Sequence, residues 1–250
     1  MKLLQATLLG ATILAGTTGI ASAADVYDGG YKDEPVAAYA PIAWTGFYLG
    51  AFAGLGIAET KATDIEDTDF GLGVTETLTQ DGAILGATIG YNMRYDNWVF
   101  GPEIEFGYSD NDELKFVEDD SAILTEYGFY SVLGGRLGYA SDRALIYAKA
   151  GLAIADINSR AGDFDGDSDT GPDGFDGGAS AFGDEIRYGF AIGGGLEYAI
   201  SNSVSLKAEY LYMDFGQETL NGTDGDTPFT FDDTMQTVKL GISYHLNSGH

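Results

Sequence analysis

The residues of this sequence that could do chemistry are charged side chains at alternate positions inside otherwise apolar segments. Such side chains can act as general acids and bases, select ions, or pair with one another where water is excluded. Glutamates and basic residues occur among them in similar numbers, so pairing is available to most of them. These residues are Glu103, Glu105, Arg136, Lys149, Arg187, Glu197, Lys207, Glu209 and Lys239.

A second pattern, of alternating aspartates, could bind a hard divalent cation. Asp163, Asp165, Asp167 and Asp169 resemble the first half of an EF-hand loop, in which carboxylate oxygens hold Ca²⁺. The sixth position is Ser168 instead of glycine, however, and the twelfth is Gly174 instead of glutamate. We therefore expect diffuse association with divalent cations here, and no specific metal site.

Residues for nucleophilic catalysis are scarce. The chain has no cysteine and two histidines, His245 and His250. A serine or acyl-transfer mechanism needs a base within reach of the nucleophile, and His245 stands among alternating residues near the C-terminus as a polar side chain. The glycine runs at 134–135 and 193–195 lie inside predicted strands and are not phosphate loops. We expect neither enzyme activity nor a cofactor.

The composition excludes several classes of protein. With 12 Lys+Arg against 39 Asp+Glu the formal net charge is −27, which is the wrong sign for binding nucleic acid. A disordered acidic chain is excluded because 44% of the residues are hydrophobic and 13% aromatic. Abundant glycine, tyrosine and phenylalanine favour strands over helices.

The N-terminus carries an export signal. Lys2 precedes an apolar stretch that ends in Ala21-Ser22-Ala23, the pattern of a cleaved signal peptide over 1–23. Residues 24–44 combine breakers and charges without a period, as in a periplasmic linker. The sequence therefore predicts a barrel domain over 45–246, described below, and a short tail over 247–250.

From residue 46 onward, apolar and polar residues alternate with a period of two. The pattern is clearest where Val238, Leu240, Ile242 and Tyr244 stand between small or polar neighbours. It recurs at 46–57, 82–93, 98–108, 127–139, 144–155, 186–200, 203–213 and 237–246. Short turns alternate with long loops at 58–81, 109–126, 156–185 and 214–234. The sequence predicts an all-β, eight-stranded antiparallel up-and-down barrel.

Charge decides between a soluble lipocalin-like carrier and a transmembrane barrel. An eight-stranded interior holds only side chains of limited total volume, so the large apolar residues would overfill it, whereas the small and charged face fits. The apolar face should therefore contact lipid, with aromatic girdles at the strand ends. The expected girdle residues are Phe47, Tyr91, Trp98, Tyr108, Tyr127, Tyr139, Tyr188, Tyr198, Tyr212 and Tyr244.

The charged residues on the opposite face would then line a narrow lumen. An unpaired buried charge costs several kcal/mol, so we expect an ion-pair network that plugs the barrel. The alternative is a narrow ion-conducting porin whose selectivity constriction these residues form. The long loops collect acidic residues and, with both termini on the periplasmic side, face outward as hydrated surface.

Several segments resemble a known family when they are taken in order. They are 44–54 (WTGFYLGAFAG), 86–92 (GATIGYN), 100–108 (FGPEIEFGY), 136–139 (RLGY) and 207–212 (KAEYLY). Together they resemble the small Gram-negative outer-membrane β-barrel "porin family", also called outer-membrane immunogenic or opacity-like proteins. Leu246 stands where such barrels commonly end on an aromatic residue.

The resemblance implies a location in the cell outer membrane and roles in envelope integrity, surface antigenicity or host contact. The implied partners are outer-membrane lipid, lipopolysaccharide and the outer-membrane assembly machinery, with a host or surface ligand unidentified. Some relatives bind haemin, so a surface receptor for haemin or divalent cations is a further alternative. No motif in this sequence identifies haemin ligands.

Overall fold

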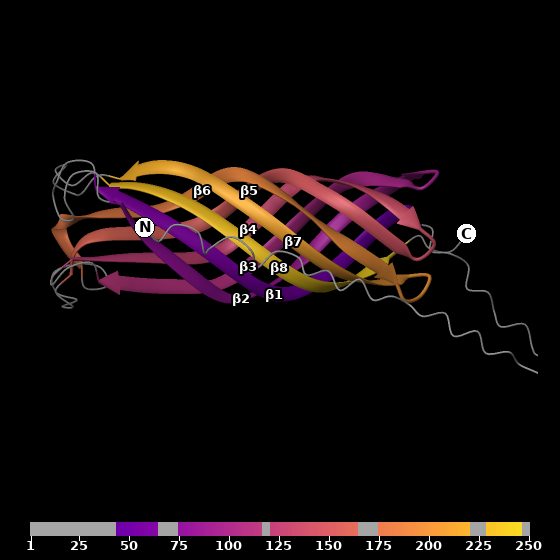
Figure 1. Ribbon diagram of the computed structural model, residues 1–250, viewed down its shortest axis with the longest axis horizontal. Coiled ribbons are helices and arrows are strands. Elements are labelled where there is room, and N and C mark those ends of the chain that lie inside the picture. Colours follow the sequence, from indigo (N-terminus) through magenta and orange to yellow (C-terminus); the bar gives the residue numbers. More distant parts are fainter. Residues whose placement is uncertain (1–43, 65–74, 117–120, 165–174, 221–228, 247–250) are drawn as a thin grey trace, which may run out of the picture. The chain divides into compact units, whose positions relative to one another are not determined.

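Eight antiparallel strands form a closed barrel in a computed structural model that describes residues 44–64, 75–116, 121–164, 175–220 and 229–246. Each strand pairs with its neighbours in the chain, and β1 pairs with β8. Figure 1 shows the strands running obliquely around the barrel, with β1 beside β8. The strands are β1 (Gly46–Asp64), β2 (Thr75–Tyr95), β3 (Trp98–Phe116), β4 (Ser121–Ser141), β5 (Ala144–Phe164), β6 (Phe175–Ala199), β7 (Val204–Leu220) and β8 (Phe229–His245).

The predicted architecture and strand order are confirmed, but the strands are longer than predicted. Much of each predicted long loop belongs to a strand: β1 continues to Asp64 and β8 begins at Phe229. In β1, β2 and β8 the outward side chains of these extensions are polar or charged, so alternation with apolar residues could not reveal them. The predicted signal peptide, nearly all of the linker and the tail over 247–250 lie outside the described residues.

Short turns join the strands at the end of the barrel where β1 begins and β8 ends. Asp96 and Asp142 have φ values of 53° and 50° in the connections between β2 and β3 and between β4 and β5. Aspartate tolerates this left-handed conformation, which two-residue hairpins require. Both barrel termini therefore share one end with the short turns, and the longer connections lie at the other end.

The two faces of the wall differ as the alternation predicted. Large apolar side chains such as Leu55, Leu85, Leu240 and Val238 point outward and are more than 60% exposed. Small and charged residues point inward, together with a smaller set of apolar and aromatic side chains. This arrangement excludes the lipocalin-like alternative, in which the apolar face would fill the interior. Within the described residues, no helix has the length and apolar character needed to cross a membrane.

One girdle prediction is wrong. Tyr127 is 5% exposed and lies inside the barrel, because the register of β4 against both neighbours shifts between residue 127 and Tyr130. A β-bulge inserts an extra residue and so moves the following side chains to the opposite face. The other expected girdle residues face outward in alternation with buried neighbours.

Candidate functional site

The structure places all nine sequence-predicted charged residues on the inward face, each at most 7% exposed. Every one of them except Arg187 belongs to a single group, which we name the central ion-pair network. Its carboxylates are Glu103, Glu105, Glu197 and Glu209, and its cations are Arg136, Lys149, Lys207 and Lys239. The formal charges of the network therefore cancel.

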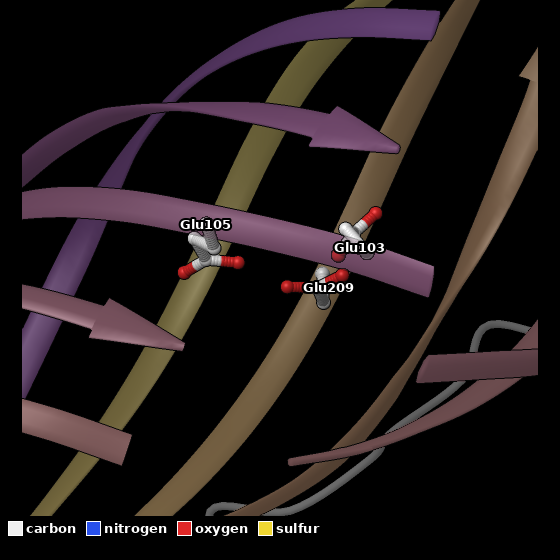
Figure 2. A group of neighbouring side chains, drawn as sticks. All are labelled: Glu103, Glu105 and Glu209. Atoms are coloured by element: carbon white, nitrogen blue, oxygen red, sulfur yellow. The ribbon is translucent and has the colours of Figure 1, made fainter. Parts of the chain in front are cut away.

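Three carboxylates of the network converge on the middle of the lumen. Glu103 and Glu105 project from β3 and Glu209 from β7, and Figure 2 shows their carboxyl groups close together. One oxygen of each lies within 4.8 Å of the others, which is close enough to share a metal ion. The lysine ammonium groups supply the positive charge instead. Lys149 Nζ lies 2.6 Å from Glu103 Oε1 and 2.6 Å from Glu105 Oε2, and 3.6 Å from Glu209 Oε1.

A second lysine completes this centre. Lys239 on β8 forms ion pairs with Glu105 and with Glu209, the latter at 2.7 Å from Oε1. Its ammonium also lies 4.9 Å from the centre of the Phe52 ring. Lys207 Nζ is 3.8 Å from Glu209 Oε2. Each of these three carboxylates is thus in contact with at least one cation, as buried charges require.

The arginine of the network lies toward the end of the barrel that carries the termini. Arg136 pairs with Glu197 at 3.0 Å and with Glu103 at 3.7 Å, and its guanidinium stacks 4.2 Å from the Tyr48 ring centre. Such a cation–π contact adds stabilisation where water is excluded. His245 Nε2 lies 3.2 Å from Glu197 Oε1 and 2.9 Å from the hydroxyl of Ser205.

Sequence reasoning missed the tyrosines that belong to the network. Tyr48, Tyr130 and Tyr147 donate hydrogen bonds to Glu103, Glu105 and Glu209 at 2.6, 3.2 and 2.7 Å. They are inward-facing aromatics, and only inward-facing glycines leave them room. The position a Cβ would take at Gly90 lies 2.2 Å from the Tyr48 hydroxyl, and at Gly107 it lies 2.2 Å from the Tyr130 ring. These tyrosines could have been identified in the sequence as aromatic residues that stand on the same face of a strand as the charged residues, by the alternation of period two.

Arg187 does not join the central network. It pairs instead with Asp233 at 3.0 Å and with Glu218 at 2.8 Å. The same Asp233 carboxylate accepts hydrogen bonds from Thr60 at 2.7 Å and Tyr127 at 3.3 Å. We name these residues the outer cluster. Glu218 and Asp233 stand in the segment 214–234, for which the alternation predicts a loop, so this cluster was not predicted.

Two clusters of apolar side chains lie inside the barrel beside the polar groups. Buried Ile84, Val132, Leu211, Met213 and Met235 belong to one apolar cluster inside the barrel. At the end with the termini, Trp44 is 1% exposed and packs with Val99, Ala140 and Leu145. Its ring meets His245 edge-on at 5.5 Å between centroids. Among the described residues, apolar side chains therefore pack inside the barrel at the end with the termini and further along the strands.

The predicted cation residues can be placed only in part. Asp163 is near the end of β5, while Asp165, Asp167 and Asp169 lie outside the described residues. Each carboxylate of the central ion-pair network lies 3.0 Å or less from a lysine or arginine nitrogen. The arrangement is suited to holding the strands together and to obstructing the lumen.

Comparisons with known proteins agree with the geometry. A family model described as "Outer membrane protein beta-barrel domain" matches residues 35–245. The "31 kDa outer-membrane immunogenic protein" of Brucella melitensis is 31% identical over 247 residues, which cover 94% of this chain and 97% of the relative. The "22 kDa outer membrane protein" of Rhizobium leguminosarum is 28% identical and covers 80% of this chain and 76% of the relative.

Solved barrels also align with the chain. The outer membrane protein OprG from Pseudomonas aeruginosa superposes with a TM-score of 0.46 and 17% identity, over 80% of this chain and 97% of that chain.

Proposed function

Since this chain belongs to the outer membrane protein β-barrel domain family, we propose that it is a structural, surface-exposed barrel whose lumen is sealed by ion pairs. The protein is located in the cell outer membrane. The proposed role is mechanical and antigenic: the barrel supports the envelope and presents its longer connections at the surface, without catalysing a reaction.

The observation that supports the proposal is the set of buried ion pairs around Lys149. The side chains of Lys149, Lys239 and Lys207 are at most 3% exposed, and each pairs with one or more of the carboxylates of Glu103, Glu105 and Glu209. Ions that cross a narrow pore need a hydrated path. Buried charges that are already paired with one another provide no net charge to attract an ion into the lumen. The apolar cluster beside the network opposes hydration further.

Planar-bilayer conductance tests the seal. The wild-type barrel should give no steady openings, whereas a variant carrying Arg136→Ser, Lys149→Ser and Glu105→Ser should conduct, because three long charged side chains of the lumen are replaced by short uncharged ones. The matched control is Lys61→Ser, whose side chain is 47% exposed outside the barrel. Steady wild-type openings that vanish in Glu209→Gln would instead identify a channel and would contradict the seal.

Surface presentation is tested separately on intact cells. An epitope tag inserted between β7 and β8 should be detected without permeabilisation. The same tag in the turn between Tyr95 and Trp98 should be detected only after the outer membrane is opened. The reverse result would contradict the proposed orientation, in which the termini and short turns face the periplasm.

A further inference from the structure

The pairing of the strands around the barrel stops short of its outer end, the end with the longer connections. Among the described residues, β2 and β3 stop pairing at Ile84 and Ser109, and β6 and β7 stop at Phe190 and Asp214. The other neighbours stay paired beyond these positions. The wall therefore divides into two four-stranded sheets, β7-β8-β1-β2 and β3-β4-β5-β6, separated by a β2/β3 seam and a β6/β7 seam.

The two seams differ in the contacts at their base. At the β6/β7 seam, Arg187 donates a hydrogen bond to the Gly216 carbonyl at 3.2 Å and pairs with Glu218 at 2.8 Å, which ties the two sheets together. At the β2/β3 seam, β3 has a bulge between Tyr108 and Asn111. A bulge bends its strand, whereas β2 continues in unbroken register with β1. β3 therefore turns away from a straight strand.

We name residues 78–83, of sequence LTQDGA, the β2 edge. Successive residues of a strand direct their N–H and C=O groups to opposite neighbours, so about three residues of the edge direct theirs toward the seam. Natural proteins usually protect such edges with lysine, proline or a bulge, and the β2 edge has none of these. Thr79 and Asp81 point outward from it, so the edge lies above the acyl chains, among which unpaired backbone is not tolerated.

The interior beneath the edge is packed. Leu78 and Gln80 are 1% and 2% exposed, and Gln80 Nε2 donates a hydrogen bond to the Thr125 carbonyl of β4 at 2.9 Å. A ligand can therefore be added beside β2 but cannot enter the barrel there. The ligand that fits a strand edge is one further extended strand, which exchanges backbone hydrogen bonds with the edge.

Charge and direction determine which extended segment fits. Two upright copies of this chain would bring identical β2 edges together only in parallel, which is the less stable pairing. Each copy also carries a formal net charge of −27, so two copies repel one another. The edge itself contains Asp81 and no basic residue. These features favour a foreign segment that carries positive charge.

We propose that the β2 edge binds an extended, cationic segment of another protein as an added antiparallel strand. The cationic side chains of the segment alternate along its outward face beside Thr79 and Asp81, where cross-strand pairs of opposite charge stabilise a sheet. The inference goes beyond the proposed function. It depends on the proposed orientation only for the side of the membrane from which the partner comes.

A fluorescent seven-residue peptide of alternating lysine and valine is the probe, and its anisotropy with the purified barrel in uncharged detergent measures binding. Two further peptides are N-methylated, one at the lysines and one at the valines. Only residues of one phase can pair with β2, so one methylated form should bind about tenfold more weakly, whereas the other should bind like the unmodified peptide. Equal binding of the two methylated forms, or no binding of the unmodified peptide, overturns the proposal.

The absence of cysteine from the sequence allows the site to be mapped. A peptide whose central lysine is replaced by cysteine should form a disulfide with Thr79→Cys faster than with Thr234→Cys. Both positions pair with Glu59, but Thr234 lies on β8, which has a paired strand on each side. Asp81→Asn should weaken peptide binding by about threefold, and Asp232→Asn on β8 should leave it unchanged. Equal disulfide rates, or equal weakening by the two asparagine variants, would show diffuse attraction and overturn the proposal.

These measurements are independent of the proposed function. Binding in detergent depends neither on lumen conductance nor on which end of the barrel faces outward. A conducting wild-type barrel or a reversed surface tag would therefore contradict the proposed function and leave the peptide result intact. Absent peptide binding beside a sealed, correctly oriented barrel would overturn this inference alone.

Discussion

Lys149 Nζ lies 2.6 Å from Glu105 Oε2, so the ammonium group takes the place that a metal ion would occupy among three buried carboxylates. This single contact joins β5 to β3, the two strands that flank β4. Because neither group is exposed, each depends on the other to offset the loss of hydration.

Removing the central cation should destabilise the barrel strongly. Lys149→Met leaves Glu103, Glu105 and Glu209 with less positive charge nearby and should reduce the free energy of unfolding by about 3–5 kcal/mol. Urea unfolding in detergent, followed by the gel mobility of folded and heated protein, measures the change. Adding Glu105→Gln should recover part of the loss. Lys61→Met, at an exposed pair, should change stability by about 1 kcal/mol or less, and an equal loss there would contradict the argument.

The outer cluster should act as a unit that is independent of the central network. Arg187→Gln and Asp233→Asn should each cost about 1.5–3 kcal/mol, and the double variant should cost less than the sum because the two groups are partners. A double-mutant cycle from urea unfolding gives the coupling. Arg187→Gln combined with Lys149→Met should be additive within about 0.5 kcal/mol, since they share no partner. Strong coupling between those two would show one continuous network.

Glycines that contact the rings of the inward-facing tyrosines should not be replaceable by larger residues without a loss of stability. Gly90→Ala would place a Cβ 2.2 Å from the Tyr48 hydroxyl, whose position is held by the hydrogen bond to Glu103. We expect a loss of about 1–3 kcal/mol from overpacking. The control is Gly135→Ala, where the nearest atom, Gly101 O, is 3.4 Å away. Folding yields and unfolding midpoints compare the two, and equal tolerance would count against the packed lumen.

The two tryptophans should report opposite sides of the wall. Trp44 is 1% exposed inside the barrel, whereas Trp98 is 51% exposed on the outside beside Tyr139. In bilayers of brominated lipid, the fluorescence of Trp44→Phe protein, which retains Trp98, should be quenched. The fluorescence of Trp98→Phe protein, which retains Trp44, should be much less affected. Equal quenching would place Trp44 outside the lumen.

The local alternation in the sequence predicted the barrel and the direction of its charged side chains. A strand's side chains alternate between two faces, so the inward position of Glu103, Lys149 and Lys239 follows from their phase with neighbouring apolar residues. The extent of the strands was not predictable in this way. Above the apolar belt the outward residues are polar, as at Lys61 and Asp232, and alternation loses its contrast.

Which charges meet was decided only by the tertiary structure. Lys239 and Glu105 are 134 positions apart and come together because the closed register of β1 to β8 brings their strands across one lumen. Arg187 was separated from the network, and Tyr127 was turned inward, by registers and a bulge that no single strand encodes. The period of two determines on which face of the barrel wall a side chain lies. Its position along the barrel axis and its partners depend on the stagger of the strand register around the closed barrel.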